Sequence, residues 1–120
     1  MRIEVQKNGV PVAIITFHTN PQKFDSDYER IKFFKELHGW KQTVPKNGKR
    51  YMYHRPGLLD EVPHVKLADS AFMVAMEHMD QVRKYFDVWA DKVHCEMFKA
   101  MINDQKRIRQ LSGEEVSSNE

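Results

Sequence analysis

Cations gather between Trp40 and Pro56, and they are the residues with the clearest chemistry in the chain. This stretch has five lysines and arginines and no aspartate or glutamate. Cations without neighbouring acids raise the local potential and attract anions, such as a phosphate group, a nucleic acid or an acidic protein surface. The sequence therefore predicts an anion-binding site, and its candidate ligand-binding residues are Lys41, Lys46, Lys49, Arg50, His54 and Arg55.

The Asn47-Gly48 pair in the middle of this stretch predicts how the cations are positioned. A two-residue turn of type I′ needs positive φ at both central residues, which asparagine and glycine adopt at the lowest steric cost. Folding the chain about this turn predicts three cross-strand pairs: Trp40 with Arg55, Gln42 with Tyr53, and Val44 with Tyr51. We interpret the result as a hairpin with one aromatic face and one basic face, on which phosphate contact is favoured over base stacking.

Six histidines and the single cysteine, Cys95, are the other candidates for chemistry. None of them has the spacing of a metal-binding motif, and the glycines are isolated rather than grouped in a phosphate-binding loop, so we expect neither a metal nor a cofactor. His54 could act in phosphodiester hydrolysis with His18 or His38 as its partner, if the fold brought two of them together. Cys95 is expected to be an inert, half-buried thiol. We assign no catalytic residue and expect a protein that is not an enzyme.

The composition sets outer bounds on the class of protein. A chain of 120 residues with 41% hydrophobic and 30% charged residues has the size and balance of one soluble globular domain. It has no apolar run of the length that spans a membrane, its N-terminus lacks the apolar core of a signal peptide, and a single cysteine suits a reducing compartment. We therefore expect a cytoplasmic protein. Its net charge of +2 is low for a dedicated non-specific DNA-binding protein.

The first half of the chain predicts a further hairpin and a helix. Asn8-Gly9 repeats the turn chemistry, and folding about it predicts two pairs: Val5 with Val12 and Ile3 with Ile14. Ser26 and Glu29 have the spacing of a capping box, which predicts a helix over 27–38 that Gly39 ends. We expect the two hairpins to form a small antiparallel sheet, with this short helix between them in the chain.

The second half predicts helix. Residues 64–111 contain no glycine or proline, and apolar residues recur there at helical spacing, which indicates one long helix over about 71–111 or a helical hairpin. A continuous helix of that length would measure about 60 Å, more than the roughly 35 Å diameter of a compact chain of this size. It would then project and bury its apolar stripe against a second copy, so we expect a homo-oligomer such as a homodimer. The expected oligomer interface residues are Phe72, Met76, Met79, Phe86, Trp89, Val93, Met97 and Met101.

Together these elements predict an α+β fold. We expect a single domain over 1–111, with a sheet part at 1–66 and a long helical part at 67–111, followed by a disordered tail at 112–120. The first function that we expect is a non-enzymatic oligomeric binding protein that captures a phosphate-bearing ligand, nucleic acid or a small nucleotide, through the basic hairpin. The alternative is a small protein-binding inhibitor or adaptor, of the kind that phages and mobile elements encode, acting through a methionine-rich helix face or a sheet edge. A second alternative is a small His-dependent hydrolase or nuclease.

Overall fold

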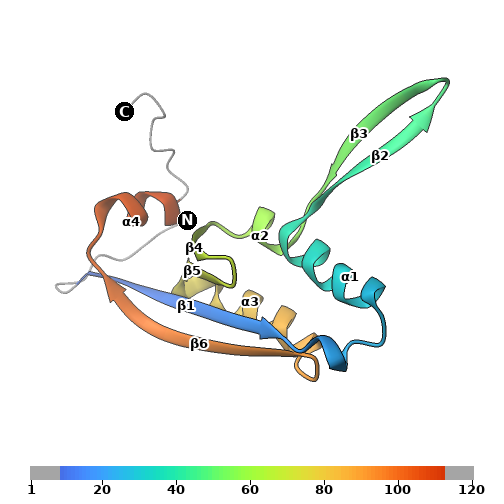
Figure 1. Cartoon of the computed structure of the whole chain (residues 1–120). Helices are drawn as coiled ribbons and strands as arrows, with labels where there is room; N and C mark the ends of the chain where they lie inside the picture. The colour runs from blue at the N-terminus through green and yellow to red at the C-terminus, as the bar shows by residue number, and fades with distance from the viewer. Residues whose placement is uncertain (1–8, 113–120) are drawn as a thin grey trace.

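The computed structural model describes residues 9–112, which form a mixed α+β fold with a four-stranded and a two-stranded antiparallel sheet (Figure 1). The strands are β1 (Val10–Thr19), β2 (Trp40–Lys46), β3 (Lys49–Arg55), β4 (His64–Ala68), β5 (Ala71–Ala75) and β6 (Val93–Ile102). The helices are α1 (Asp27–His38), α2 (Leu58–Glu61), α3 (Met79–Val88) and α4 (Gln105–Leu111), with short 3-10 helices at Pro21–Lys23 and Met76–His78. None of the helices in this part of the chain combines the length and the apolar character that crossing a membrane requires.

Strand β1 is central in the four-stranded sheet, whose order is β4-β5-β1-β6. Successive side chains of a strand point to opposite faces of the sheet, and both faces of β1 are covered. Ile15 and Phe17 lie in the core that the sheet forms with α1 and α3. Val10 and Val12 lie in a second core, to which α4 contributes Leu111. Burial on both faces explains why residues 10–17 of β1 are apolar at every position except Thr16, rather than at every second position.

Helix α1 begins and ends as the sequence predicts. The Ser26 side chain accepts a hydrogen bond from the Glu29 N–H at 3.2 Å. Gly39 has a φ of 80° and donates its N–H to the Lys35 carbonyl at 2.8 Å, which ends the helix. The helix buries Phe33, whose ring contacts aromatic rings of both β1 and α3. These contacts place α1 and α3 on the same face of the sheet.

The expectation that the two hairpins share one sheet is wrong. The first predicted turn, at Asn8, and the predicted partner residues Ile3 and Val5 lie outside the described residues. Val12 and Ile14, to which they were expected to pair, instead pair with β5 on one side and with β6 on the other. The second hairpin, β2–β3, forms a two-stranded sheet of its own. The neighbours of β1 therefore come from the half of the chain whose apolar spacing predicts helix.

The long helix over 71–111 is also wrong, because this segment contains β5, α3, β6 and α4. Helix α3 ends at Val88, and the chain then turns so tightly that the N–H groups of Lys92 and Val93 both donate to the Trp89 carbonyl at 2.9 Å. The turn uses no glycine or proline, which are the usual signals of a helix end. Strand β5 is buried at four of its five positions, and a strand buried on both faces has no alternation that would distinguish it from a buried helix.

Most of the expected oligomer interface belongs to the core of the chain itself. Five of its residues are buried there: Phe72, Met79, Phe86, Trp89 and Val93. Met76 and Met97 pack against the same core, and Met101 is exposed. The methionine-rich helix face does not form, because Met73 lies in the core beside α4 and Met79 lies in the other core. A helix too long for one compact chain was the reason to expect assembly, and this helix does not form. Assembly into an oligomer stays a prediction, and so does the single domain over 1–111.

Leu111→Ala should lower the free energy of unfolding by about 2–4 kcal/mol, because it removes a fully buried side chain from the core beside α4 and leaves a cavity. The matched control is Leu67→Ala, at a leucine that is 42% exposed, which should cost less than about 1 kcal/mol. Urea denaturation of both variants measures the difference. Equal losses would show that α4 does not close this core.

Candidate functional site

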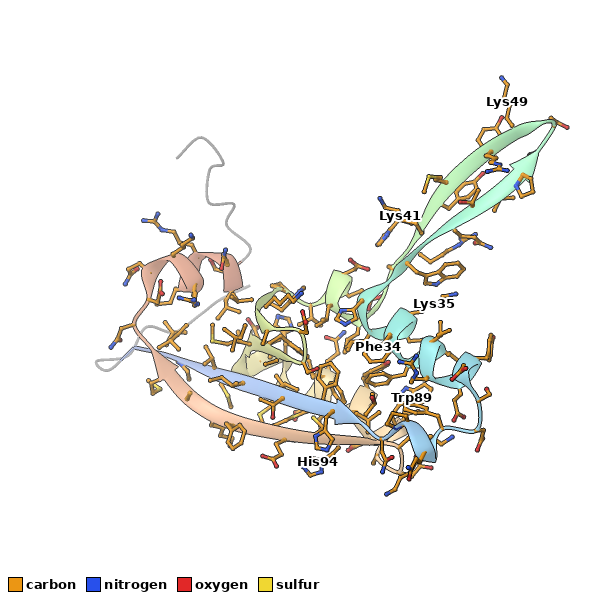
Figure 2. All side chains as sticks on the ribbon, in the orientation of Figure 1. Phe34, Lys35, Lys41, Lys49, Trp89 and His94 are labelled. Carbon is orange, nitrogen blue, oxygen red and sulfur yellow. The ribbon has the colours of Figure 1, made fainter. Side chains whose placement is uncertain are left out.

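The β2–β3 hairpin, residues 40–55, projects from the body of the protein, and we call it the hairpin arm (Figure 1). Every residue of β3 is exposed, and every residue of β2 is exposed or only partly buried. Figure 2 places the Lys49 side chain at the far end of the arm and Lys35 and Lys41 near its base. Because no residue of the arm belongs to either core, its side chains are available to a ligand.

The turn and the register of the arm are those that the sequence predicts. Asn47 has a φ of 54° and Gly48 a φ of 75°, and both are positive, as a type I′ turn requires. The observed pairs include the three predicted ones: Trp40 with Arg55, Gln42 with Tyr53, and Val44 with Tyr51. The hairpin prediction is therefore confirmed in its turn and in its pairing.

The division of the arm into one aromatic and one basic face is wrong. Facing residues of an antiparallel pair point to the same side, and the side alternates along each strand. The face with the aromatic residues Trp40, Tyr51 and Tyr53 consequently also has Lys46, Lys49 and Arg55. The remaining candidate ligand-binding residues, Lys41, Arg50 and His54, lie on the other face. We call the first of these the aromatic face, and it has three of the five cations of the arm.

Contacts at the base of the arm bring cations and rings of the aromatic face together. Arg55 donates a hydrogen bond from Nε to Gln42 Oε1 at 2.6 Å, and its guanidinium carbon lies 5.6 Å from the centre of the Tyr53 ring. Lys35, in the last turn of α1, places its Nζ 4.1 Å from the centre of the Trp40 ring. Aromatic faces attract cations in this position. Lys35 therefore joins the candidate site. The sequence analysis missed it because Lys35 lies in the predicted helix, outside the cation-rich stretch from Trp40 to Pro56.

Two glycines and one aspartate, Gly39, Gly57 and Asp60, attach the arm to the body, and we call them the arm root. The glycines lie so close together that a Cβ at Gly57 would stand 2.2 Å from the Gly39 nitrogen. The Gly57 N–H donates to Asp60 Oδ2 at 2.7 Å, and the same oxygen lies 3.0 Å from His54 Nε2. These contacts join the end of β3 to the start of α2. His54 is thereby directed toward the arm root, whereas the five lysines and arginines of the arm are free of ion pairs within the described residues.

The histidines considered as catalytic partners of His54 lie in different surroundings. His18 of β1 lies beside His94 of β6, with ring centres 4.9 Å apart and the rings tilted by 37°. His38 ends α1, where burial lowers its pKa and the nearby Lys66 lowers it further. Within residues 9–112, no group of three histidine, cysteine or acidic side chains is arranged to hold a metal ion. The hydrolase alternative stays a prediction.

Among the hollows on the surface of residues 9–112, three are lined by residues outside the arm. One of about 380 Å³ lies between α3 and β6, and one of about 480 Å³ lies between β4 and α4. The smallest, of about 80 Å³, is lined by residues of α1, α2, β4 and β5. Because every residue of β3 is exposed, the arm presents its cations and rings on an open surface, which suits an extended ligand better than an enclosed one.

Comparisons of the chain with protein-family models, with curated proteins and with solved structures find no match. The function of the arm is therefore inferred from its own residues and geometry.

Gly57→Ala should lower the melting temperature more than Gly48→Ala does. At Gly57 the added Cβ would lie within 2.8 Å of three backbone atoms of residues 37–39, so α1 and the arm root would have to move apart. At Gly48 the positive φ disfavours alanine by about 1 kcal/mol, but no atom lies within 4 Å of the added one. Thermal unfolding followed by circular dichroism compares the two. A larger loss at Gly48 would contradict the packed root.

Asp60→Ala should destabilise the protein at neutral pH and much less in acid. Hydrogen bonds from the Gly57 N–H, and secondarily from His54, hold the pKa of the Asp60 carboxyl below its ordinary value. A carboxylate with a lowered pKa contributes stability above the ordinary aspartate value, and this contribution is lost as the pH falls through the lowered one. The free energy of unfolding of the wild type should therefore exceed that of the variant by about 1 kcal/mol near pH 7. This difference should disappear as the pH falls below about 4. Urea denaturation over a pH series measures the gap, and a gap that is independent of pH would contradict the role of the carboxylate.

Proposed function

We propose that the hairpin arm binds single-stranded nucleic acid, stacking unpaired bases on the aromatic face and holding phosphates with the cations beside it. One observation carries the proposal. Tyr51 and Tyr53 are 41% and 45% exposed, and they share their face with Lys46, Lys49 and Arg55. Surfaces that bind single strands combine aromatic platforms for the bases with positive charge along the backbone.

The spread of the cations favours a polymeric ligand over a small nucleotide. Lys49 and Arg55 stand at opposite ends of β3, about 20 Å apart at a rise of about 3.3 Å per residue. The phosphates of one small nucleotide cannot reach both ends, whereas a nucleic-acid strand presents a charge at every nucleotide. Contact along the whole arm therefore requires a chain of phosphates.

The spacing of Tyr51 and Tyr53 favours unpaired bases. Residues two apart on one face of a strand are separated by about 7 Å, roughly twice the 3.4 Å between nucleotides stacked in a duplex. A strand that stacks on both rings must open the stack between its bases. A single strand opens its stack more easily than a duplex does, because its bases are not held by pairing.

The modest net charge of the chain is compatible with this function because the charge is concentrated. Residues 40–56 have five cations and no acid, so the rest of the chain has a net charge of −3 when the whole has +2. A polyanion is therefore attracted to the arm and not to the protein as a whole. Binding that depends on a few phosphate contacts should weaken as the salt concentration rises.

Tyr51→Ala and Tyr53→Ala should each weaken the binding of a fluorescent oligothymidine about tenfold, because a base stacked on an aromatic side chain is worth roughly 1–3 kcal/mol. Lys49→Ala should also weaken it, and the plot of log affinity against log salt should become shallower by about 0.7, the value for one phosphate of a single strand. Fluorescence anisotropy over a salt series measures both effects.

Two exposed residues outside the arm provide matched controls. Tyr28→Ala on α1, at a tyrosine that is 76% exposed, and Lys84→Ala on α3 repeat the same substitutions and should bind as the wild type does. Tyrosine variants of the arm that bind like the wild type would contradict base stacking. A wild type that binds no oligonucleotide would contradict the proposed function. Tighter binding of a duplex than of a single strand would contradict the preference for unpaired bases and would indicate that the arm enters a groove of the duplex.

A further inference from the structure

Strand β6 leaves one edge of the four-stranded sheet open. Within the described residues it pairs only with β1, over ten residues in unbroken register. About half of its backbone N–H and C=O groups therefore point away from the sheet, where a further strand can pair with them. The opposite edge, β4, has five residues and an irregular register, and short, irregular edges resist such pairing. Of the two edges, β6 is the one that can accept another strand.

The side chains of β6 also suit contact with another strand. Phe98 is 50% exposed and Met101 is 42% exposed, although both are large and apolar. The strand has no proline, and Lys99 is its only lysine, so it has few of the devices that keep edge strands apart. These exposed apolar side chains lie on both faces of the strand, because 98 and 101 differ by an odd number.

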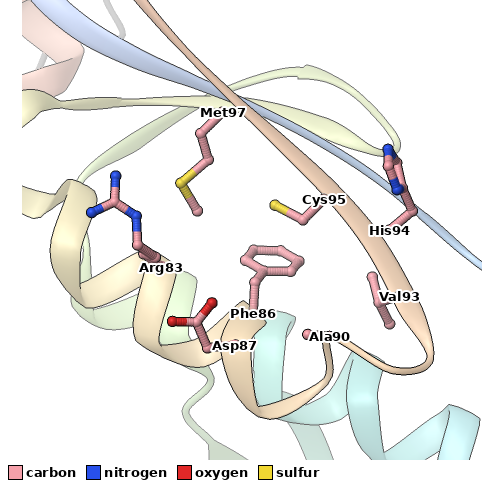
Figure 3. Close-up of a pocket in the computed structure, with 8 residues that line it drawn as sticks. All are labelled: Arg83, Phe86, Asp87, Ala90, Val93, His94, Cys95 and Met97. Atoms are coloured by element: carbon pink, nitrogen blue, oxygen red, sulfur yellow. The ribbon is translucent and has the colours of Figure 1, made fainter.

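A groove runs beside this edge, on the face that α3 covers (Figure 3). It has an open volume of about 380 Å³, and Cys95 and Met97 of β6 are among the residues that line it. Its charged lining residues on α3 are Asp87 and Arg83, and Arg83 already pairs with Asp80 at 3.0 Å. Figure 3 shows Cys95 and Met97 pointing from β6 toward α3. Burial raises the pKa of the Cys95 thiol to about 11, so this side chain lines the groove as a neutral group. A strand added to β6 would place alternate side chains beside this groove.

We propose that β6 of a second copy of this chain pairs with β6 in the antiparallel direction, with Met97 on the twofold axis. The axis of such a pair is perpendicular to the sheet, so the numbers of two facing residues have a constant sum. The sum is even, because facing residues point to the same side and the side alternates along the strand. Each possible register is therefore defined by the one residue that faces itself.

Charge selects the register with Met97 on the axis. In this register Lys99 of the second copy lies opposite Cys95, and Asp87 is close enough to Cys95 to affect its thiol. Neither Asp87 nor Lys99 forms an ion pair within residues 9–112. The second copy brings the two opposite charges together, and symmetry does so twice. With Phe98 on the axis, Lys99 would lie opposite Met97 instead, farther along the strand from Asp87.

The same register covers the exposed apolar side chains of the edge. Met101 of one copy lies opposite Val93 of the other, and Phe98 lies opposite Glu96. Met101 and Phe98, which are exposed in the single chain, therefore lose contact with water. Three residues of the expected oligomer interface, Val93, Met97 and Met101, are on β6. The assembly thus relies on a sheet edge, whereas the sequence pattern places it on a helix stripe.

Sedimentation equilibrium of the full chain at about 100 micromolar should find a dimer, because a high protomer concentration favours association. Lys99→Glu and Asp87→Lys should each weaken dimerisation at least about tenfold, because like charges then face each other at two symmetric places. The double variant Lys99→Glu/Asp87→Lys should restore the wild-type Kd. If each single substitution acted only by disturbing the fold, combining the two would not restore dimerisation. Lys84→Glu, on the same helix but away from the groove, is the matched control and should dimerise as the wild type does.

Cross-linking tests the register itself. With Cys95→Ser as the background, Met97→Cys should form a disulfide-linked dimer under mild oxidation, because facing Cα atoms lie about 4.5–5.5 Å apart, within the range of a disulfide. Phe98→Cys in the same background should cross-link far less. A monomeric wild type, as expected if another segment of the chain covers the edge, would overturn the proposal. So would charge variants that dimerise like the wild type, or a cross-link that forms with Phe98→Cys in place of Met97→Cys.

Discussion

Between Val10 and Phe17, strand β1 is buried or partly buried on both faces, and the arrangement of the other elements of the body follows from this burial. The residues of β1 that point to one side are covered by α1 and α3, and those that point to the other side are covered with the help of α4. Its two edges are occupied by β5 and β6, so its backbone groups are paired as well as its side chains. A segment that is covered on both faces has to be largely apolar, and the run from Val10 to Phe17 contains only one polar residue, Thr16.

The hairpin arm is exposed where β1 is buried, because within the described residues no other strand pairs with it and no helix covers it. An isolated two-stranded hairpin is at best marginally stable in water, so its shape has to be supported at its two ends. At the far end, Asn47 and Gly48 adopt the positive φ values that match the twist of the strands. At the base, the contact of Gly39 with Gly57 and the hydrogen bonds of Asp60 hold the strands to α1 and α2. The side chains between these ends are not needed for packing, which leaves cations and aromatic rings on the surface.

The arm and the edge of β6 belong to different elements, and the chemistry that we propose for them differs accordingly. In these proposals the arm would act through charge and aromatic rings, which suit a nucleic-acid strand, and the edge would act through backbone hydrogen bonds and exposed apolar side chains, which suit another β-strand. A dimer formed through β6 has two arms. Two weak contacts with one long ligand then reinforce each other, because the second contact becomes intramolecular. Dimerisation would therefore raise the affinity for a polymer without changing either arm.

The sequence by itself determined the features that a few neighbouring residues control. Ser26 and Gly39 mark the two ends of α1, and Asn47-Gly48 sets the turn and the register of the arm. The mixture of cations and rings on the aromatic face follows from that register. Only the tertiary structure decided which strands flank β1 and that 71–111 breaks into strands and helices. A cap or a tight turn is decided by local φ values and hydrogen bonds, whose preferences each residue type displays. The partner of a strand is decided by segments far away in the chain, as when Val10 pairs with Ile102. A strand that is buried on both faces also lacks the alternation of apolar and polar residues by which a strand is predicted from sequence.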